Sequence, residues 1–138
     1  MKKIAVKTTS KNYEIFIGEG LSRKFDFDSI VHKREIFLII DKNVPKRIIE
    51  DLKKNLESSF PKRIIEKKIF ASEKNKNLAY VSKIYDFMLN KKLARDCLVI
   101  GIGGGITCDI AGFVSATFLR GVEFLLLPTT LLAQVDAS

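Results

Sequence analysis

The pattern of apolar and polar positions predicts strands of two kinds in the first part of the chain. Residues 4–8 and 13–17 are short β-rich runs on either side of the polar segment 10–12, a spacing typical of a β-hairpin. Residues 35–40 form instead a nearly unbroken apolar run that ends at Asp41. Such a run is typical of a strand buried on both faces of a parallel sheet.

Helical and extended patterns then alternate to the end of the chain. Ile48, Leu52 and Leu56 recur at four-residue steps and predict one apolar face of a helix. Asn43 is placed to cap that helix, and Pro45 to lie in its first turn. Further strands are predicted over 63–70, 97–102 and 124–127, and further helices over 78–88 and 107–119.

This alternation predicts an α/β fold. We expect a Rossmann-like, mostly parallel sheet flanked by helices, prefaced by the N-terminal β-hairpin, because strand–helix–strand units connect with right-handed crossovers. The length of 138 residues suits a single domain over residues 1–138. With 46% hydrophobic and 29% charged residues, the chain is neither disordered nor collagen-like.

Cysteine usage and the absence of targeting signals indicate a cytoplasmic protein. Cys97 and Cys108 cannot form a disulfide framework, which suits a reducing compartment. No signal peptide follows Met1, and no apolar run reaches the roughly 18 residues of a membrane span. We therefore expect a cytoplasmic location and no membrane partner.

The net charge of +8 is unevenly distributed. Residues 1–95 hold 23 of the 24 Lys and Arg residues, whereas residues 96–138 hold Arg120 alone. The lysines are scattered over predicted helix faces and strand ends, without interleaved aromatic residues that would stack on bases. We expect a solvated basic surface and no nucleic acid partner.

Residues that follow the strands are the candidate binding residues, because ligands of open α/β sheets bind beyond the carboxyl ends of the strands. We expect four such groups to meet at one edge of the sheet. They are Asp41 and Asn43, then Glu73 and Lys76 in the polar loop 71–76, then the glycine-rich segment 103–109, then Thr129 and Thr130.

The glycine-rich turn is the clearest of these signals. Gly103, Gly104 and Gly105 lie between a strand and a helix, where the helix start offers free N–H groups to a pyrophosphate. The turn departs from the pattern G-x-G-x-x-G because Cys108 takes the place of the third glycine, although its small side chain still permits close packing. A turn that serves packing alone is the alternative.

The acidic residues each have two interpretations. Asp41 can accept hydrogen bonds from both ribose hydroxyls of an adenosine and would repel a 2′-phosphate, which favours NAD over NADP, or it can cap a helix. Glu73 and Lys76 by themselves indicate a solvated ion pair. Asp109, in the first turn of its helix, can satisfy the helix dipole or hydrogen-bond a cofactor. Asp136 lies in an apolar segment and needs a partner if it is buried.

Three further residue types complete the inventory. Thr129 and Thr130 supply uncharged hydroxyl donors at a strand end. Arg120 can cap helix carbonyls or face an anion. His32 is the only histidine, so a histidine-based zinc site cannot be built from this chain, and we predict no metal ligands in it.

Together these residues resemble the N-terminal, NAD-binding half of 3-dehydroquinate synthase, in the sugar-phosphate cyclase superfamily. The most specific stretch is GGGITCDIAGF at 103–113, which continues through LRGV at 119–122 to PTTLLAQVD at 128–136. Upstream, residues 41–44 and 72–76 are similar to the two adenosine-side segments of the family. Two positions depart from the family pattern: Ser72 replaces a common glycine, and Thr107-Cys108 replaces an aliphatic-glycine pair.

The resemblance implies a role for each candidate residue. It implies that Asp136 touches the carbocyclic substrate and that Arg120 reaches the substrate phosphate bound by the neighbouring subunit of a homodimer. The cofactor residues divide into three groups: Asp41 and Asn43 for ribose and adenine, Glu73 and Lys76 for the loop that closes on the nucleotide, and Gly104, Gly105, Asp109, Thr129 and Thr130 for the pyrophosphate and nicotinamide side.

The activity that the resemblance implies is the conversion of 3-deoxy-D-arabino-heptulosonate 7-phosphate to 3-dehydroquinate and phosphate. This lyase reaction of the shikimate pathway, which leads to chorismate and the aromatic amino acids, uses NAD and Zn²⁺ or Co²⁺. The family continues with a glycine-lysine motif and a helical metal domain, both absent here. We therefore expect part of a longer two-domain enzyme, inactive alone. Another sugar-phosphate cyclase and a glycerol-dehydrogenase-like metal-dependent alcohol dehydrogenase are the alternatives, together with a non-catalytic nucleotide-binding module.

Overall fold

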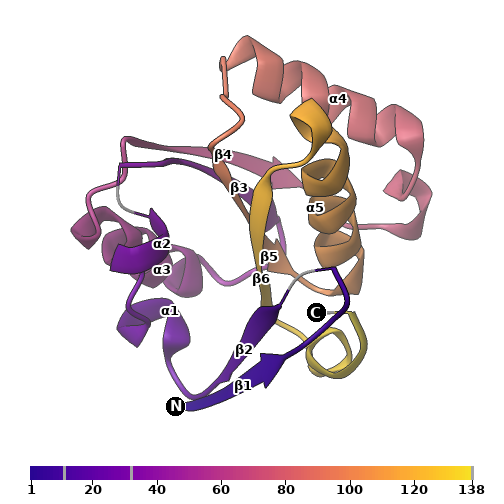
Figure 1. Ribbon diagram of the computed structural model, residues 1–138. Helices are drawn as coiled ribbons and strands as arrows, with labels where there is room; N and C mark the ends of the chain where they lie inside the picture. The colour runs from indigo at the N-terminus through magenta and orange to yellow at the C-terminus, as the bar shows by residue number, and fades with distance from the viewer. Residues whose placement is uncertain (11, 32, 138) are drawn as a thin grey trace.

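The computed structural model of the protein describes residues 1–10, 12–31 and 33–137. It shows a four-stranded sheet with helices on both faces and a separate two-stranded hairpin at the N-terminus (Figure 1). The predicted α/β class is therefore confirmed. Lys11, in the predicted hairpin turn, and His32, the only histidine, lie outside the described residues.

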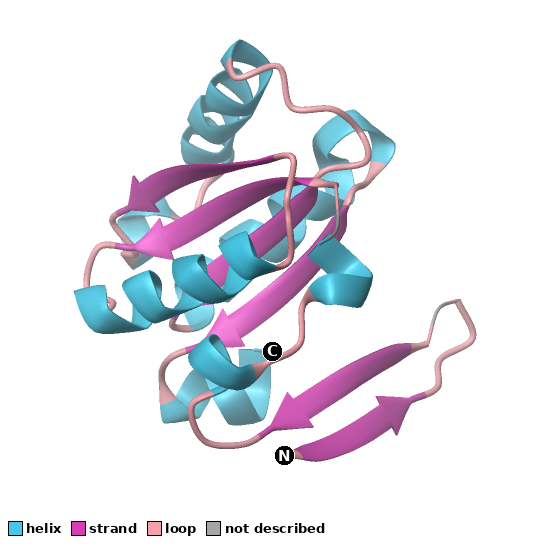
Figure 2. Cartoon of the chain, turned by 90° about the vertical axis from the view of Figure 1, so that its left-hand side faces the viewer, coloured by secondary structure: helices cyan, strands magenta, loops and turns pink. Residues whose placement is uncertain are grey.

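Strands β1 (Lys2–Val6) and β2 (Tyr13–Ile17) form the predicted hairpin. They pair in antiparallel fashion, with Lys2 opposite Ile17 and Val6 opposite Tyr13. Within the described residues no further strand joins this ribbon, and most of its side chains are exposed. The hairpin lies apart from the main sheet (Figure 2).

The main sheet has the order β4-β3-β5-β6, with all neighbours parallel. The two central strands, β3 and β5, are buried along almost their whole length, which explains their apolar runs. Parallel pairing places the carboxyl ends of all the strands at one edge. The bounds are β3 (Glu35–Asp41), β4 (Arg63–Ile69), β5 (Leu98–Gly103) and β6 (Glu123–Pro128).

Helices cover both faces of the sheet because alternate residues of β3 and β5 point to opposite sides. On one face, Leu52 and Leu56 of α3 (Lys46–Ser58) pack with Leu38 of β3. On the other, α4 (Leu78–Asn90) and α5 (Gly105–Thr117) enclose a second core that includes Phe37 and Val99. Four short elements complete the chain: α1 (Leu21–Lys24), α2 (Asp28–Val31), η1 (Glu73–Asn75) and η2 (Phe118–Arg120), with a π-turn, η3 (Ala133–Ala137), after β6.

Two of the predicted helix starts were wrong. The N-cap of α3 is Pro45, without a side-chain hydrogen bond, so Asn43 does not cap this helix. Its backbone N–H donates instead to Oδ1 of Asp41 at 3.0 Å, which closes a separate turn before the helix. Helix α5 begins at Gly105, two residues before the predicted start, because the extended Gly104 is its N-cap.

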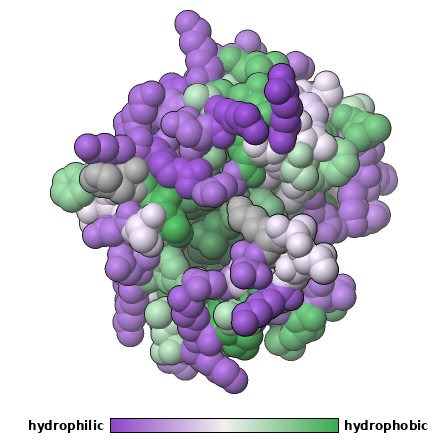
Figure 3. Space-filling view, viewed as in Figure 1, coloured by the Kyte–Doolittle hydropathy of each residue, from purple (hydrophilic) through white to green (hydrophobic). Residues whose placement is uncertain are grey.

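The surface is mostly hydrophilic on the side seen in Figure 3, where apolar side chains show in a hollow near the centre. None of the helices in the described part of the chain combines the length and the apolar character needed to cross a membrane. Around the last described segment, however, Leu131, Leu132 and Val135 are 77%, 72% and 74% exposed.

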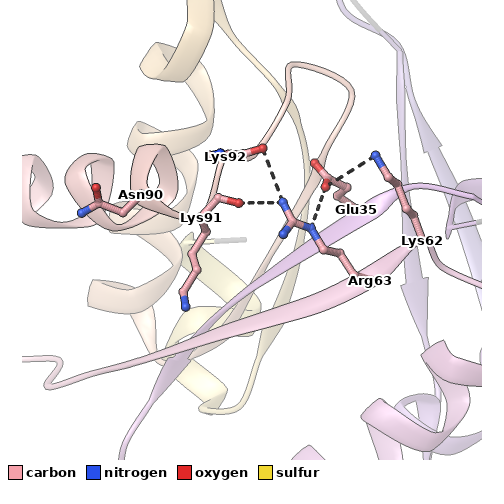
Figure 4. Close-up of a pocket in the computed structure, with 6 residues that line it drawn as sticks. All are labelled: Glu35, Lys62, Arg63, Asn90, Lys91 and Lys92. Atoms are coloured by element: carbon pink, nitrogen blue, oxygen red, sulfur yellow. Dashed lines mark hydrogen bonds and ion pairs between the residues drawn. The ribbon is translucent and has the colours of Figure 1, made fainter.

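A buried carboxylate ties the sheet together at its amino edge (Figure 4). Glu35 is 4% exposed and accepts hydrogen bonds from Nε of Arg63 at 2.6 Å and from the N–H of Ala94 at 3.1 Å. Arg63 also donates to the carbonyl of Lys91 at 2.6 Å, and Nζ of Lys62 lies 3.8 Å from the carboxylate. These groups line an open pocket of about 570 Å³, on the side of the sheet away from the strand carboxyl ends.

The environment of Glu35 lowers its pKa on balance. Burial of the carboxyl raises the pKa, but the N–H of Ala94, the hydrogen bond and charge of Arg63, and the charge of Lys62 together outweigh burial. The pKa therefore lies below the usual 4.5, and the ionised form is preferred in the folded state. This cluster is a structural link between β3, β4 and the end of α4.

The first prediction tests this link. Glu35→Gln keeps the side-chain shape but removes the charge, and should lower the free energy of unfolding at pH 7 by about 1–3 kcal/mol. Since the pKa of Glu35 is lower in the folded state than in the unfolded state, its stabilisation is present above about pH 4.5 and is lost as the pH falls through the folded-state value. Urea unfolding should therefore show a smaller difference in the free energy of unfolding between the wild type and Glu35→Gln at pH 3 than at pH 7.

The matched control is Glu66→Gln. Glu66 pairs with Lys53 at 3.0 Å, but both side chains are more than one-third exposed at 39% and 37%. An exposed pair contributes at most about 1 kcal/mol, so this variant should unfold close to the wild-type midpoint. Equal losses in the two variants would contradict a specific role for the buried carboxylate.

Candidate functional site

The carboxyl ends of β3, β5 and β6 meet at one point. Gly103 of β5 pairs with Pro128 of β6, and the N–H of Thr129 donates to the carbonyl of Gly103 at 2.8 Å. A Cβ built on Gly103 would lie 2.9 Å from Cβ of Asp41, at the end of β3. The structure therefore brings together Asp41, the glycine-rich turn and the threonine pair, as the sequence predicted.

The glycine-rich turn opens helix α5 without a side-chain cap. Gly104 is extended, with φ −80° and ψ −173°, and no side chain of the described residues caps the N–H groups that follow it. A Cβ on Gly104 would lie 3.3 Å from Cγ2 of Thr130, so the two residues face each other across the turn. The first turn of a 13-residue helix thus keeps N–H groups and a positive dipole end for an anion.

The threonine pair starts the turn that follows β6. Oγ1 of Thr130 accepts from the N–H of Ala133 at 3.2 Å, and the carbonyl of Thr130 accepts from the N–H of Gln134 at 3.1 Å. A hydroxyl that accepts one hydrogen bond still has its own proton to donate. Thr130 is exposed, while Thr129 is half-buried beside Gly103.

An ion pair brings the polar loop to α5. Nζ of Lys76 lies 2.6 Å from Oδ2 of Asp109, with the two side chains 44% and 42% exposed. The hydrogen bond and charge of Asp109 raise the pKa of Lys76, with a further contribution from the charge of Glu73. Asp109 is the fifth residue of α5, so its predicted place in the first turn was wrong, and its charge serves Lys76 instead.

Asp41 keeps part of its carboxylate available. Oδ1 accepts from the N–H of Asn43, and the backbone carbonyl of Asp41 accepts from the N–H of Val44 at 3.1 Å. Within the described residues Oδ2 makes no hydrogen bond, and the side chain is half-buried at the end of β3. Asn43 is exposed beside it, and Glu73 is exposed in η1.

Arg120 lies outside this group of residues. It follows α5, whose 13 residues span about 20 Å at 1.5 Å per residue, so it lies at the far end of the helix from the glycine turn. Leu119 and Arg120 have φ of +47° and +71°, and Gly121 has φ of +105°, a strained turn that projects from the end of α5.

Asp136 stays on the same side of the molecule as the threonine pair. It lies in η3, which packs against α5 and β6. The side chain is exposed, so the buried alternative does not apply. Neither the side chain of Asp136 nor that of Arg120 makes a hydrogen bond or ion pair within the described residues.

The cysteines offer no reactive group to the site. Burial raises the pKa of the Cys97 and Cys108 thiols to about 11, aided by the charge of Glu35 for the first and of Asp109 for the second. In the part of the chain that the structure describes, no three His, Cys, Asp or Glu side chains gather closely enough to hold a metal ion.

One residue of the site was not predicted from the sequence. Thr107, the third residue of α5, is fully buried, and its Oγ1 has no hydrogen-bond partner in the described structure. The hydroxyl lies 2.6 Å from the position that a Cβ of Gly103 would take. The only signal in the sequence was a polar residue at a position where the family pattern has an aliphatic one.

The edge as a whole suits a dinucleotide. An unpaired carboxylate oxygen on Asp41 fits ribose hydroxyls, and the uncapped start of α5 fits a diphosphate. The missing side chain at Gly103 lets Thr107 and Asp41 pack against the backbone, and a Cβ at Gly104 would contact only Thr130. Fold and edge together define the class: a Rossmann-like α/β domain with the features of a dinucleotide site.

Comparison with known proteins gives the family. Residues 66–138, more than half of the chain, match the model of the family described as 3-dehydroquinate synthase N-terminal. The chain therefore belongs to the 3-dehydroquinate synthase N-terminal family. The chain is 43% identical to 3-dehydroquinate synthase from Pelagibacter ubique, over 99% of this chain and 37% of that protein. It is 38% identical to the synthase from Clostridium kluyveri, over 100% of this chain and 39% of that protein.

The chain thus spans less than two-fifths of the length of these curated relatives. Among solved structures, 2-deoxy-scyllo-inosose synthase superposes with a TM-score of 0.86 at 20% identity, over 98% of this chain and 38% of that chain. The 2-epi-5-epi-valiolone synthase of Streptomyces hygroscopicus subsp. jinggangensis 5008 gives 0.79 at 24% identity, over 97% and 36%. Glycerol dehydrogenase from Schizosaccharomyces pombe gives 0.56 at 18% identity, over 79% and 25%. The chain therefore shares the fold of the matching part of these proteins, most closely that of the two synthases.

The second prediction tests the close approach at the glycine turn. In Gly103→Ala the new Cβ would meet Cβ of Thr107 at 2.7 Å and Cβ of Asp41 at 2.9 Å. These atoms are fixed to the backbone, so the substitution should cost about 1–3 kcal/mol in the free energy of unfolding, measured in urea.

The control is Gly112→Ala in helix α5. A Cβ at Gly112 meets nothing within 4 Å, and alanine favours a helix interior by up to about 1 kcal/mol. This variant should be as stable as the wild type or more stable. A Gly103→Ala protein that unfolds at the wild-type midpoint would show that the tip of β5 is not tightly packed.

Proposed function

We propose that the chain is the NAD-binding part of a 3-dehydroquinate synthase. The observation that carries this is the meeting of Asp41, the uncapped glycine turn and the threonine pair at one edge, in a chain of this family. Two related cyclases have been solved with NAD⁺: 2-deoxy-scyllo-inosose synthase, with carbaglucose-6-phosphate and Co²⁺, and the valiolone synthase, with Zn²⁺. NAD would supply a transient hydride acceptor for a substrate hydroxyl.

The proposed roles follow the geometry. Asp41 and Asn43 bind the adenosine ribose and adenine, and the start of α5 at Gly104 and Gly105 binds the diphosphate through backbone N–H groups. The loop holding Glu73 and Lys76 closes over the nucleotide and is tied down by Asp109. Thr129 and Thr130 face the nicotinamide half, and Asp136 contacts the substrate.

Arg120 points to a homodimer. Because it lies about 20 Å along α5 from the glycine turn, it is too far to serve the site of its own chain. We therefore propose that it reaches the substrate phosphate in a neighbouring subunit, presented by the strained turn at Leu119. An exposed guanidinium suits a phosphate through bidentate hydrogen bonds.

The complete reaction is the conversion of 3-deoxy-D-arabino-heptulosonate 7-phosphate to 3-dehydroquinate and phosphate, a lyase step in the cytoplasm. We place the ligands of the Zn²⁺ or Co²⁺ ion outside the described residues, because no suitable cluster exists among them. Exposed Leu131, Leu132 and Val135 beside the site support a further part of the enzyme covering this face. We propose no nucleic acid partner.

A second candidate is the NAD-binding part of a different sugar-phosphate cyclase. The close superposition on 2-deoxy-scyllo-inosose synthase supports it, because the cyclases share this domain and differ in their substrates. The proposed 3-dehydroquinate synthase function is supported by sequence identities of 43% and 38% with two proteins of that name. A glycerol-dehydrogenase-like function has weaker support, since the superposition covers only 79% of the chain.

The third prediction is that the chain binds NAD and that Asp41 contributes to binding. Calorimetric titration should show Asp41→Ala weakening NAD binding about tenfold or more, since a charged acceptor for ribose hydroxyls is worth about 1.5–3 kcal/mol. The wild type should bind NADP more weakly than NAD, and this difference in affinity should be smaller in Asp41→Ala. Asp86→Ala, which removes an exposed carboxylate on α4, is the matched control and should bind NAD like the wild type.

Wild-type protein that gives no NAD signal would contradict the proposed function. Equal weakening by both alanine substitutions would instead indicate a general effect of net charge. Because the chain carries a net charge of +8, the titrations should be repeated at two salt concentrations to separate specific binding from non-specific attraction of an anion.

The fourth prediction concerns catalysis. The 138-residue chain supplied with NAD, Co²⁺ and 3-deoxy-D-arabino-heptulosonate 7-phosphate should release no phosphate above background, because the metal ligands lie elsewhere in the proposed enzyme. A coupled phosphate assay measures this, with a complete 3-dehydroquinate synthase as the positive control. Turnover by the chain alone would contradict the proposal that the metal ligands lie in another part of the enzyme.

A further inference from the structure

The hydroxyl of Thr107 is a costly feature at the centre of the candidate site. Thr107 is fully buried, and its Oγ1 is without a hydrogen-bond partner among the described residues. A buried hydroxyl left unpaired costs about 1–3 kcal/mol, whereas valine would fill the same volume without that cost. The position is the third of α5, within the turn that the glycine segment opens.

The hydroxyl and Asp41 both pack against Gly103 at the tip of β5. The position of a Cβ on Gly103 lies 2.6 Å from Oγ1 of Thr107 and 2.9 Å from Cβ of Asp41. Only glycine is tolerated here, because any side chain would clash with both residues. The hydroxyl of Thr107 therefore lies at the end of the sheet where Asp41 lies.

Asp41 has the matching acceptor. Its Oδ1 takes the N–H of Asn43 at 3.0 Å, and its Oδ2 has no partner within the described residues. An unpaired hydroxyl and the side chain that carries an unpaired carboxylate oxygen thus both lie against Gly103. Oγ1 of Thr107 lies no more than about 5.5 Å from Cβ of Asp41, a distance that rotation of the carboxyl group can close to a hydrogen bond.

Building on the proposed function of this site, we propose that Thr107 is a positioning residue for Asp41. When a dinucleotide occupies the edge, Oγ1 of Thr107 donates to the carboxylate of Asp41 and fixes its orientation toward the ribose. A carboxylate has about four lone-pair positions, so it can accept from Asn43, Thr107 and the ribose hydroxyls together. The bound ligand excludes water from this corner, which strengthens the charge-assisted hydrogen bond.

The test compares Thr107→Val and Thr107→Ser in the 138-residue chain, by thermal unfolding without ligand and by calorimetric titration with NAD. The valine variant should melt about 2–5 °C higher than the wild type, since it loses an unpaired polar group. It should also bind NAD about tenfold more weakly. The serine variant keeps the hydroxyl, so it should bind NAD within about twofold of the wild type.

A double-mutant cycle gives the decisive comparison. In an Asp41→Ala background, Thr107→Val should have no further effect on NAD binding, because its partner is absent. Independent losses in the two backgrounds would overturn the proposal. So would a valine variant that binds NAD like the wild type, or one that melts lower, which would mean that the hydroxyl serves the apo fold.

The outcomes separate this proposal from the proposed function. A wild-type chain that fails to bind NAD contradicts the dinucleotide site itself, and with it the role of Thr107. A wild-type chain that binds NAD, with a valine variant that binds equally well, leaves the dinucleotide site standing and overturns only the positioning role.

Discussion

The site depends on how closely helix α5 approaches strand β5. A Cβ on Gly101 would lie 2.6 Å from Cβ of Ala111, and a Cβ on Gly103 would lie 2.7 Å from Cβ of Thr107. Two missing side chains on alternate residues of one strand therefore let the helix lie directly against the sheet. This contact places the uncapped start of α5 at the tip of β5, where Asp41 and Thr129 also lie.

Within the described residues, polar groups are hydrogen-bonded at one end of the sheet, and some lack partners at the other. At the amino edge the buried carboxylate of Glu35 is satisfied by Arg63 and by the backbone of Ala94. At the carboxyl edge a carboxylate oxygen of Asp41 and the hydroxyl of Thr107 lack partners within the described residues. Satisfied buried groups specify one fold, whereas unpaired groups cost stability and are retained where a ligand can complete them.

Local patterns predicted the fold well because they act within one element. The alternation in the first 17 residues gave the hairpin, and the apolar runs ending at Asp41 and Ile102 gave the two central strands. The general rule for open α/β sheets also predicted that Asp41, the glycine turn and Thr129 would meet at the strand carboxyl ends, where the structure places them. The short helices α1 and α2 were missed because four residues are too few to show a periodic pattern.

What the sequence could not supply were pairings between distant residues. Lys76 and Asp109 are 33 positions apart in the chain. The sequence predicted a solvated pair of Lys76 with Glu73, and a helix-dipole or cofactor contact for Asp109, whereas the structure pairs Lys76 with Asp109. The start of α5 was placed too late because glycine is a poor helix former, although a helix can begin at Gly105 when the residue before it is extended.

The unpaired groups bear on how binding and folding are coupled in this domain. If the polar groups of the proposed dinucleotide site were satisfied internally, as those of the amino edge are, a ligand would have to break hydrogen bonds before making its own. Because Oδ2 of Asp41, the hydroxyl of Thr107 and the first N–H groups of α5 lack side-chain partners, a ligand here adds hydrogen bonds without displacing any within the described structure. The stability that the fold loses through these unpaired groups is recovered when a ligand pairs with them. A domain that binds in this way is therefore stabilised by its ligand.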